Sequence, residues 1–65
     1  MSEELKEKIL EYLGTKGHGK NRDIARALDV EKGLVDKAIA ELTKEGKAEY
    51  RSFGGITVVA LRGEE

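Results

Sequence analysis

The C-terminal part of the sequence constrains the fold most, because it places two strand-like segments around a pair of glycines. The stretch KAEYRSFGGITVVALRG runs from Lys47 to Gly63 and carries aromatic and β-branched residues on both sides of Gly54-Gly55. Glycine tolerates the positive φ angles that a two-residue hairpin turn requires. The stretch therefore predicts two antiparallel strands that end the chain as a β-hairpin.

The same turn predicts which side chains share a face of the hairpin, since side chains alternate along a strand. Phe53 is placed opposite Ile56, and every other pair follows from that one. The face predicted to close over the helices carries Ala48, Tyr50, Val59 and Leu61. The other face carries Arg51, Phe53, Ile56 and Val58. This second face is too apolar for a strand surface that meets only water, so it is predicted either to pack on a neighbouring element or to contact a partner.

Before the hairpin, apolar residues recur at helical spacing in successive segments. A first helix is predicted from the stripe of Leu5, Ile9, Tyr12 and Leu13, with Ser2 as its cap and with Lys6 facing water. Gly14 or Gly17 is expected to end it. The segment GTKGHGK, residues 14–20, is predicted to be a loop with one short strand.

Two further helices are predicted with a tight turn between them. The second begins at Asn21, which is expected to be its N-cap, and buries Ile24, Ala25 and Leu28. The turn is assigned to residues 29–33. The third helix extends to about Glu45 with a core stripe of Val35, Ile39 and Leu42, and Gly46 stops it.

The order of these elements predicts an α+β fold, the winged helix, in which three helices are followed by a C-terminal β-hairpin wing. At 65 residues the chain is expected to be a single winged-helix domain covering residues 1–65. The chain has no cysteine, no signal-peptide pattern and no apolar run long enough to span a membrane, which favours a cytoplasmic location.

Catalytic and metal-binding functions find little support in the sequence. His18 is the only histidine, so no cluster of ligands or nucleophile–base pair can be recognised. The glycines of residues 14–20 match neither the P-loop pattern nor the dinucleotide-binding pattern, so they do not indicate a phosphate site. We therefore expect no enzymatic activity, no metal and no cofactor.

A winged helix that binds duplex DNA, for example as a transcriptional regulator, places its third helix in the major groove. The predicted nucleic-acid-binding residues are the cations of the loop, second helix, third helix and wing: Lys20, Arg22, Lys32, Lys37, Lys44 and Arg51.

The alternative is a protein-interaction winged helix that uses Arg51, Phe53, Ile56 and Val58. It is favoured by the overall net charge of −1 and by the third helix, where three lysines meet four acids between residues 31 and 46. The oligomeric state is left open between a monomer and a weak homodimer.

Two family resemblances accompany this prediction. The stretch EELKEKILEYLGTKGHGK, together with KEGKAEY, is similar to the Z-DNA-binding winged-helix domains of RNA-editing adenosine deaminases. Those domains use an Asn and a Tyr of the third helix and a wing tryptophan. Asp36 and Ala40 stand at the first two positions here, and the chain has no tryptophan.

The wing also resembles that of the dissimilatory sulfite reductase D proteins. The matching positions in EYRSFGGITVVALRG are Glu49, Tyr50, Ser52, Gly54, Thr57, Leu61 and Gly63, with Arg62 against a basic residue. In SEELKEKILEYL they are Glu3, Glu4, Lys6 and Leu13. That resemblance implies a small protein without a catalytic site or cofactor, which either binds DNA or modulates an enzyme.

Overall fold

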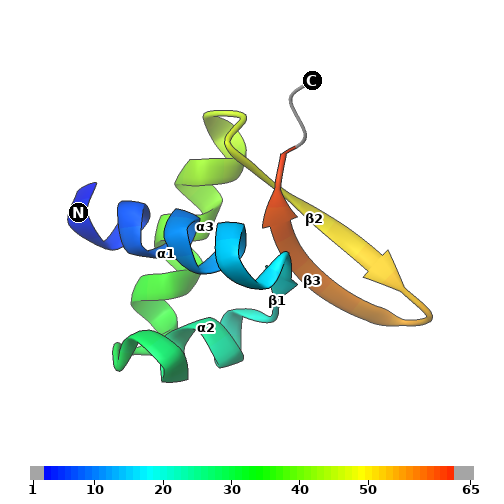
Figure 1. Ribbon diagram of the computed structural model, residues 1–65, viewed down its shortest axis with the longest axis horizontal. Helices are drawn as coiled ribbons and strands as arrows, with labels where there is room; N and C mark the ends of the chain where they lie inside the picture. The colour runs from blue at the N-terminus through cyan, green and yellow to red at the C-terminus, as the bar shows by residue number, and fades with distance from the viewer. Residues whose placement is uncertain (1–2, 63–65) are drawn as a thin grey trace.

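The computed structural model describes residues 3–62, in which three helices pack together and a hairpin extends from them (Figure 1). The predicted cap Ser2 and the wing residue Gly63 lie outside the described residues. In chain order the elements are α1 (Glu3–Lys16), β1 (His18–Gly19), α2 (Asn21–Leu28), α3 (Lys32–Lys44), β2 (Ala48–Phe53) and β3 (Ile56–Leu61). This arrangement is the winged helix that the sequence predicts.

Helix α1 continues through Gly14 to Lys16, so Gly17 is the one of the two predicted end residues that stops it. It ends at Gly17, whose φ of 91° is unfavourable for other residues and whose N–H donates to the Leu13 carbonyl at 2.7 Å. The predicted loop of residues 14–20 is therefore shorter. Its predicted short strand is present as β1, residues His18–Gly19.

The predicted N-cap of α2 is wrong. Lys20 occupies the cap position, and its side chain makes no capping hydrogen bond. Asn21 is already helical, and its side-chain Nδ2 donates instead to Asp36 Oδ1 of α3 at 2.7 Å. Asn21 thus ties the start of α2 to α3 rather than capping its own helix.

Helix α3 begins at Lys32, inside the predicted turn of residues 29–33, and ends at Lys44, in agreement with the predicted end at about Glu45, in a glycine-dependent cap. Gly46 has a φ of 79°, and its N–H donates to the Thr43 carbonyl at 3.1 Å. The N–H of Lys47 reaches the Leu42 carbonyl at 2.9 Å. These two bonds form a Schellman motif, which turns the chain sharply into β2.

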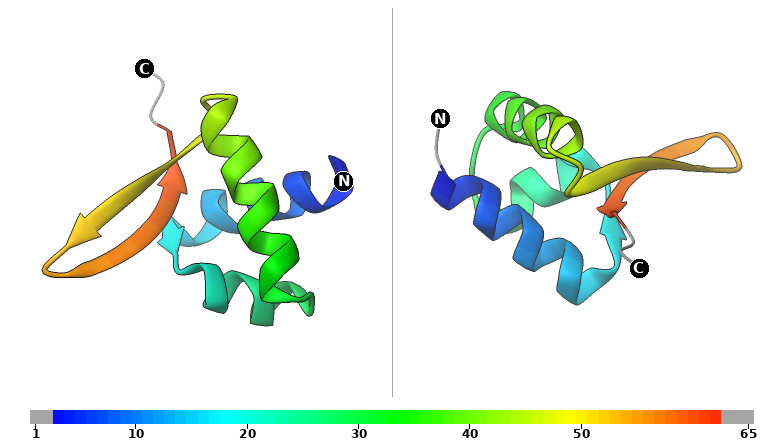
Figure 2. Two further views of the ribbon diagram at one scale, coloured as in Figure 1. Left: turned by 180° about the vertical axis from the view of Figure 1, so that it is seen from behind. Right: turned by 90° about the horizontal axis from the view of Figure 1, so that it is seen from above.

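The strands form one antiparallel sheet in the order β1-β3-β2. The predicted hairpin register is confirmed, with Phe53 opposite Ile56 and Ala48 opposite Leu61. Gly54 and Gly55 both have positive φ, 54° and 89°, as the tight turn requires. Viewed from above, the hairpin extends away from the helices as a wing (Figure 2).

The core lies between the three helices and the base of the wing. Its members come from all three helices and from both long strands: Leu5, Ile9, Leu13, Ile24, Ala25, Val35, Ala38, Ile39, Leu42, Ala48 and Val59. The face predicted to close the core does so only through Ala48 and Val59, because Tyr50, opposite Val59 on the edge strand β2, is 50% exposed. Leu61 is likewise partly exposed.

The outer face of the wing is predicted either to pack on a neighbouring element or to contact a partner, and Val58 follows the first alternative. Val58 is only 6% exposed, although its register places it on the outer face with Phe53. Lys6, predicted to face water, is 5% exposed. Its ammonium lies among carboxylates of α1 and the end of α3, 3.7 Å from Glu3, 3.4 Å from Glu41 and 2.6 Å from Glu45. Helical spacing predicts on which face of its own helix a residue lies, but it does not reveal a charged partner that comes from a helix far away in the sequence.

Candidate nucleic-acid interface

The outer face of α3 is the first part of the candidate interface. Lys32, Lys37, Ala40 and Lys44 are exposed on it, while Val35 and other apolar residues fill the opposite side. Lys37 and Lys44 are seven residues apart, so they share one face at a spacing of about 10 Å along the helix. Neither lysine forms an ion pair with any other residue of the 3–62 range. Their charges are therefore available to an anionic ligand.

Lys32 is in a different electrostatic state from the other two lysines. Its Nζ lies 3.0 Å from Asp36 Oδ2, one turn along α3, while Asp36 Oδ1 accepts the hydrogen bond from Asn21. The hydrogen bond from Asn21, followed by the one from Lys32, lowers the pKa of the Asp36 carboxyl below its ordinary value. Asp36 therefore stays ionised and compensates Lys32 in the middle of the candidate interface.

Lys20 and Arg22 flank Asn21 at the start of α2 and are exposed. The Asn21–Asp36 hydrogen bond holds this end of α2 against the first half of α3. Lys20 and Arg22 therefore lie beside the first half of α3, which carries Lys32, while Lys37 and Lys44 lie farther along α3.

Arg51 is placed apart from the other predicted cations. The register puts it on the outer face of the wing, opposite the face that carries the core residues Ala48 and Val59. Its Nη2 lies 2.7 Å from Glu49 Oε2, and its Nε donates to the same oxygen at 2.8 Å. Its role in nucleic-acid binding stays a prediction, and its charge is already matched within the strand.

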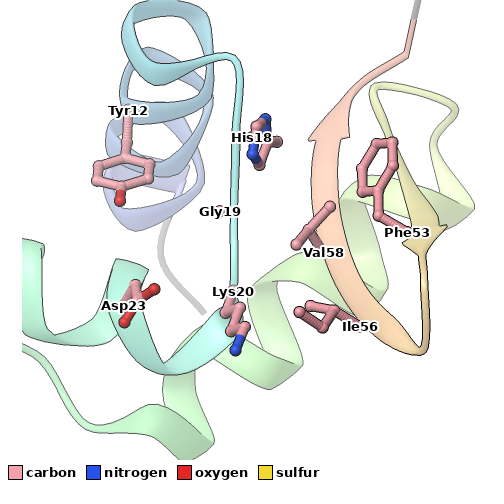
Figure 3. A pocket seen from close by; sticks show the side chains of 8 residues that line it. All are labelled: Tyr12, His18, Gly19, Lys20, Asp23, Phe53, Ile56 and Val58. Atoms are coloured by element: carbon pink, nitrogen blue, oxygen red, sulfur yellow. The ribbon is translucent and has the colours of Figure 1, made fainter.

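The outer face of the wing borders an open pocket of about 460 Å³ (Figure 3). The rings of His18 and Phe53 are 5.9 Å apart and tilted by 48°. His18 pairs with Ala60, so it lies on the same face as Val58 and helps to cover it. Phe53 is 53% exposed and Ile56 is 47% exposed. Three of the four predicted partner-binding residues, Phe53, Ile56 and Val58, therefore meet in one pocket, and Arg51 is not among its lining residues.

Sequence reasoning missed the other side of this pocket. Tyr12 from α1, His18 and Gly19 from β1, and Lys20 and Asp23 from the start of α2 complete it. These residues come together because β1 pairs with β3, and the sequence predicts the short strand but not its partner. No cluster of His, Asp or Glu that suits a metal ion occurs in residues 3–62, and no helix of that range is long and apolar enough to cross a membrane.

Comparison with known proteins identifies relatives of this fold. No protein-family model matches the sequence, and no curated protein matches it. Among solved structures, the chain is similar to the apo Zα domain of zebrafish PKZ, with a TM-score of 0.86, 23% identity, and coverage of 92% of this chain and 94% of that one. It is also similar to the Zα domain of cyprinid herpesvirus 3 ORF112, whose mode of binding to Z-DNA has been solved. There the TM-score is 0.80 and the identity 33%, over 94% and 97% of the two chains.

A third relative is dissimilatory sulfite reductase D, with a TM-score of 0.75 and 27% identity over 95% of each chain. The winged-helix prediction and both family resemblances are thereby confirmed.

Proposed function

This chain belongs to the winged-helix domains of the Zα family, and from that premise we propose that it binds nucleic acid, foremost duplex DNA, through the outer face of α3. The observation that carries the proposal is the pair Lys37 and Lys44. Both are exposed on one face of the helix that winged helices present to DNA, and neither has an acidic partner within residues 3–62.

The strength of the interaction follows from the number of uncompensated cations. Lys20, Arg22, Lys37 and Lys44 are free to contact phosphates, while Lys32 and Arg51 are paired with Asp36 and Glu49. Four phosphate contacts give a slope of about −3.6 in log affinity against log salt concentration. Binding is therefore expected to be weak at physiological salt, as the net charge of −1 also suggests.

The conformation of the duplex is a separate question. The ORF112 relative is solved with Z-DNA, but here Asp36 stands where those domains use an Asn, and both of its carboxylate oxygens are engaged. We therefore expect no strong preference for the left-handed form. Binding to a mixed-sequence duplex and to an alternating CG duplex, each at about 50 and about 200 mM salt, measures both the slope and the preference.

A charge reversal tests the surface itself. Lys37→Glu is expected to weaken binding about tenfold, since it replaces an attraction to phosphate by a repulsion. Lys8→Glu is the matched control, because Lys8 is an exposed lysine of α1 and does not belong to the outer face of α3. Fluorescence anisotropy with a labelled duplex gives the affinities. Equal weakening by both variants would reveal only a general charge effect, and the proposed surface would then be wrong.

The exposed Phe53 and Ile56 favour a second candidate, a protein-interaction domain that modulates an enzyme, as the likeness to dissimilatory sulfite reductase D suggests. Titration with purified dissimilatory sulfite reductase tests it by amide shifts around the His18–Phe53 pocket. Phe53→Asp should abolish those shifts without unfolding the domain, and Leu34→Asp is a control at another exposed apolar site. If the shifts persist in Phe53→Asp, the pocket is not the binding surface.

A further inference from the structure

Strand β2 forms one edge of the sheet, since the strand order is β1-β3-β2. One contact just beyond the strand shows which residues of β2 form hydrogen bonds to β3. The Arg62 N–H donates to the Lys47 carbonyl at 3.1 Å, so Lys47 and Arg62 are a hydrogen-bonded pair. In an antiparallel pair, successive residues point their backbone groups alternately toward and away from the neighbouring strand. Residues 49, 51 and 53 therefore bond to β3, whereas Ala48, Tyr50 and Ser52 direct their N–H and C=O groups away from the sheet.

This edge lacks most of the features by which proteins protect exposed strands. The sequence contains no proline, and no lysine lies between residues 48 and 53. The pairing with β3 runs without a bulge from Ala48–Leu61 to Phe53–Ile56. Residues 50–53 are all exposed, so neither a helix nor a loop of residues 3–62 covers the outer half of the edge.

We propose that β2 pairs with β2 of a second copy of this chain, in an antiparallel arrangement with Tyr50 opposite Tyr50 on the two-fold axis. The choice of register rests on charge. In this register Glu49 of each copy lies opposite Arg51 of the other. The neighbouring registers that keep the same hydrogen-bonding phase place either Arg51 opposite Arg51 or Glu49 opposite Glu49, and like charges directly opposite each other destabilise a strand pair.

The monomer already holds the two charged side chains in a suitable arrangement. Glu49 and Arg51 lie on the same face of β2, with Arg51 Nη2 2.7 Å from Glu49 Oε2. In the dimer, each carboxylate lies between the guanidinium of its own strand and that of the second copy. Such a contact is isologous, so it closes after two copies and does not lead to a filament.

The contact is short, because only six residues form β2. An interface of this size is expected to be weak and to assemble only at high concentration. Sedimentation velocity from about 20 µM to about 1 mM chain, without nucleic acid, covers the range in which such a dimer forms. A wild-type protein that stays monomeric at the upper concentration overturns the proposal.

Two charge variants test the register. In a dimer of Glu49→Lys, the new lysine of each copy lies opposite Arg51 of the other copy. In a dimer of Arg51→Glu, the new glutamate of each copy lies opposite Glu49 of the other copy. Like charges then face each other twice across the contact, so each variant alone is expected to lose the dimer. An equimolar mixture restores two opposite-charge pairs across the contact, and a heterodimer is expected to return. Retained dimers in either single variant, or no heterodimer in the mixture of folded variants, would contradict this register.

Discussion

Lys6 of α1 donates a hydrogen bond to Glu45, the residue that follows α3, with 2.6 Å between Nζ and Oε2. Glu41, one turn earlier, lies 3.4 Å from the same ammonium. The lysine side chain is almost completely buried, and the carboxylates at the end of α3 keep it charged there. The contact therefore fixes α1 against the end of α3, just before the chain turns into the wing.

Lys6→Met is expected to lower the thermal midpoint by about 5 °C. Methionine matches the length of the lysine stem, but it leaves Glu41 and Glu45 side by side without their shared cation. Lys8→Met, at an exposed position of the same helix, should change the midpoint little. Calorimetry of the two variants separates the cluster from a general loss of charge, and equal midpoints would show that the cluster does not stabilise the fold.

The same cluster predicts how stability depends on pH. The hydrogen bond from Lys6 lowers the pKa of Glu45 below 4.5, and the bond to Glu45 raises the pKa of Lys6 above 10.5. The Glu45 contribution is thus present above pH 4.5 and lost as pH falls through the lower folded pKa. The Lys6 contribution is present below pH 10.5 and lost as pH rises through the higher folded pKa.

The difference in midpoint between the wild type and Lys6→Met should therefore be constant between about pH 5 and about pH 10 and shrink beyond both limits. Thermal unfolding followed by circular dichroism across this range measures it. A difference that changes steeply near neutral pH would mean that another group controls the contact.

The sequence predicts the helices, the hairpin and its register because each depends on local patterns. Glycines at 46, 54 and 55 adopt the positive φ angles that their positions demand. The errors concern residues whose partners are distant in sequence. Lys6 meets Glu45, and Asn21 meets Asp36, so neither behaves as its local pattern indicates.

The candidate site is predicted less completely for the same reason. Exposed lysines can be assigned to the outer face of α3 from periodicity alone. That Lys32 is compensated by Asp36, and that Val58 is buried, depends on side chains brought together by the fold. The two-residue strand β1, which carries His18 to the wing, is too short to predict with its partner.

Asp36→Asn is expected to increase affinity for a DNA duplex about threefold, the effect of one charge about 7 Å from a phosphate in water. The substitution removes the carboxylate that compensates Lys32, while the amide oxygen still accepts from Asn21. The salt slope should become steeper by about 0.9, because Lys32 becomes a further phosphate contact.

Anisotropy titrations at several salt concentrations measure both quantities. Glu7→Gln is the control, since it removes an equal charge from an exposed position of α1, outside the candidate interface. A slope unchanged by Asp36→Asn would exclude Lys32 from the interface, even if the affinity rose.

Two glycine substitutions are expected to act in opposite directions. A Cβ at Gly19 would lie 2.9 Å from Tyr12 Cε1, so Gly19→Ala forces the tyrosine ring aside and should destabilise the fold by about 1 kcal/mol. Gly33 lies in the first turn of α3, and a Cβ there meets no described atom within 4 Å. Gly33→Ala should stabilise by about 0.5–1 kcal/mol, because alanine loses less backbone entropy in a helix.

Urea unfolding of both variants gives the two free energies. Since Tyr12 and Gly19 line the pocket beside Phe53, displacement of the ring in Gly19→Ala should also shift the amide resonances of the wing. Gly33→Ala leaves the wing untouched and serves as the control. If Gly19→Ala is as stable as the wild type, the tyrosine ring has room to move, and close packing against β1 does not set the shape of the pocket.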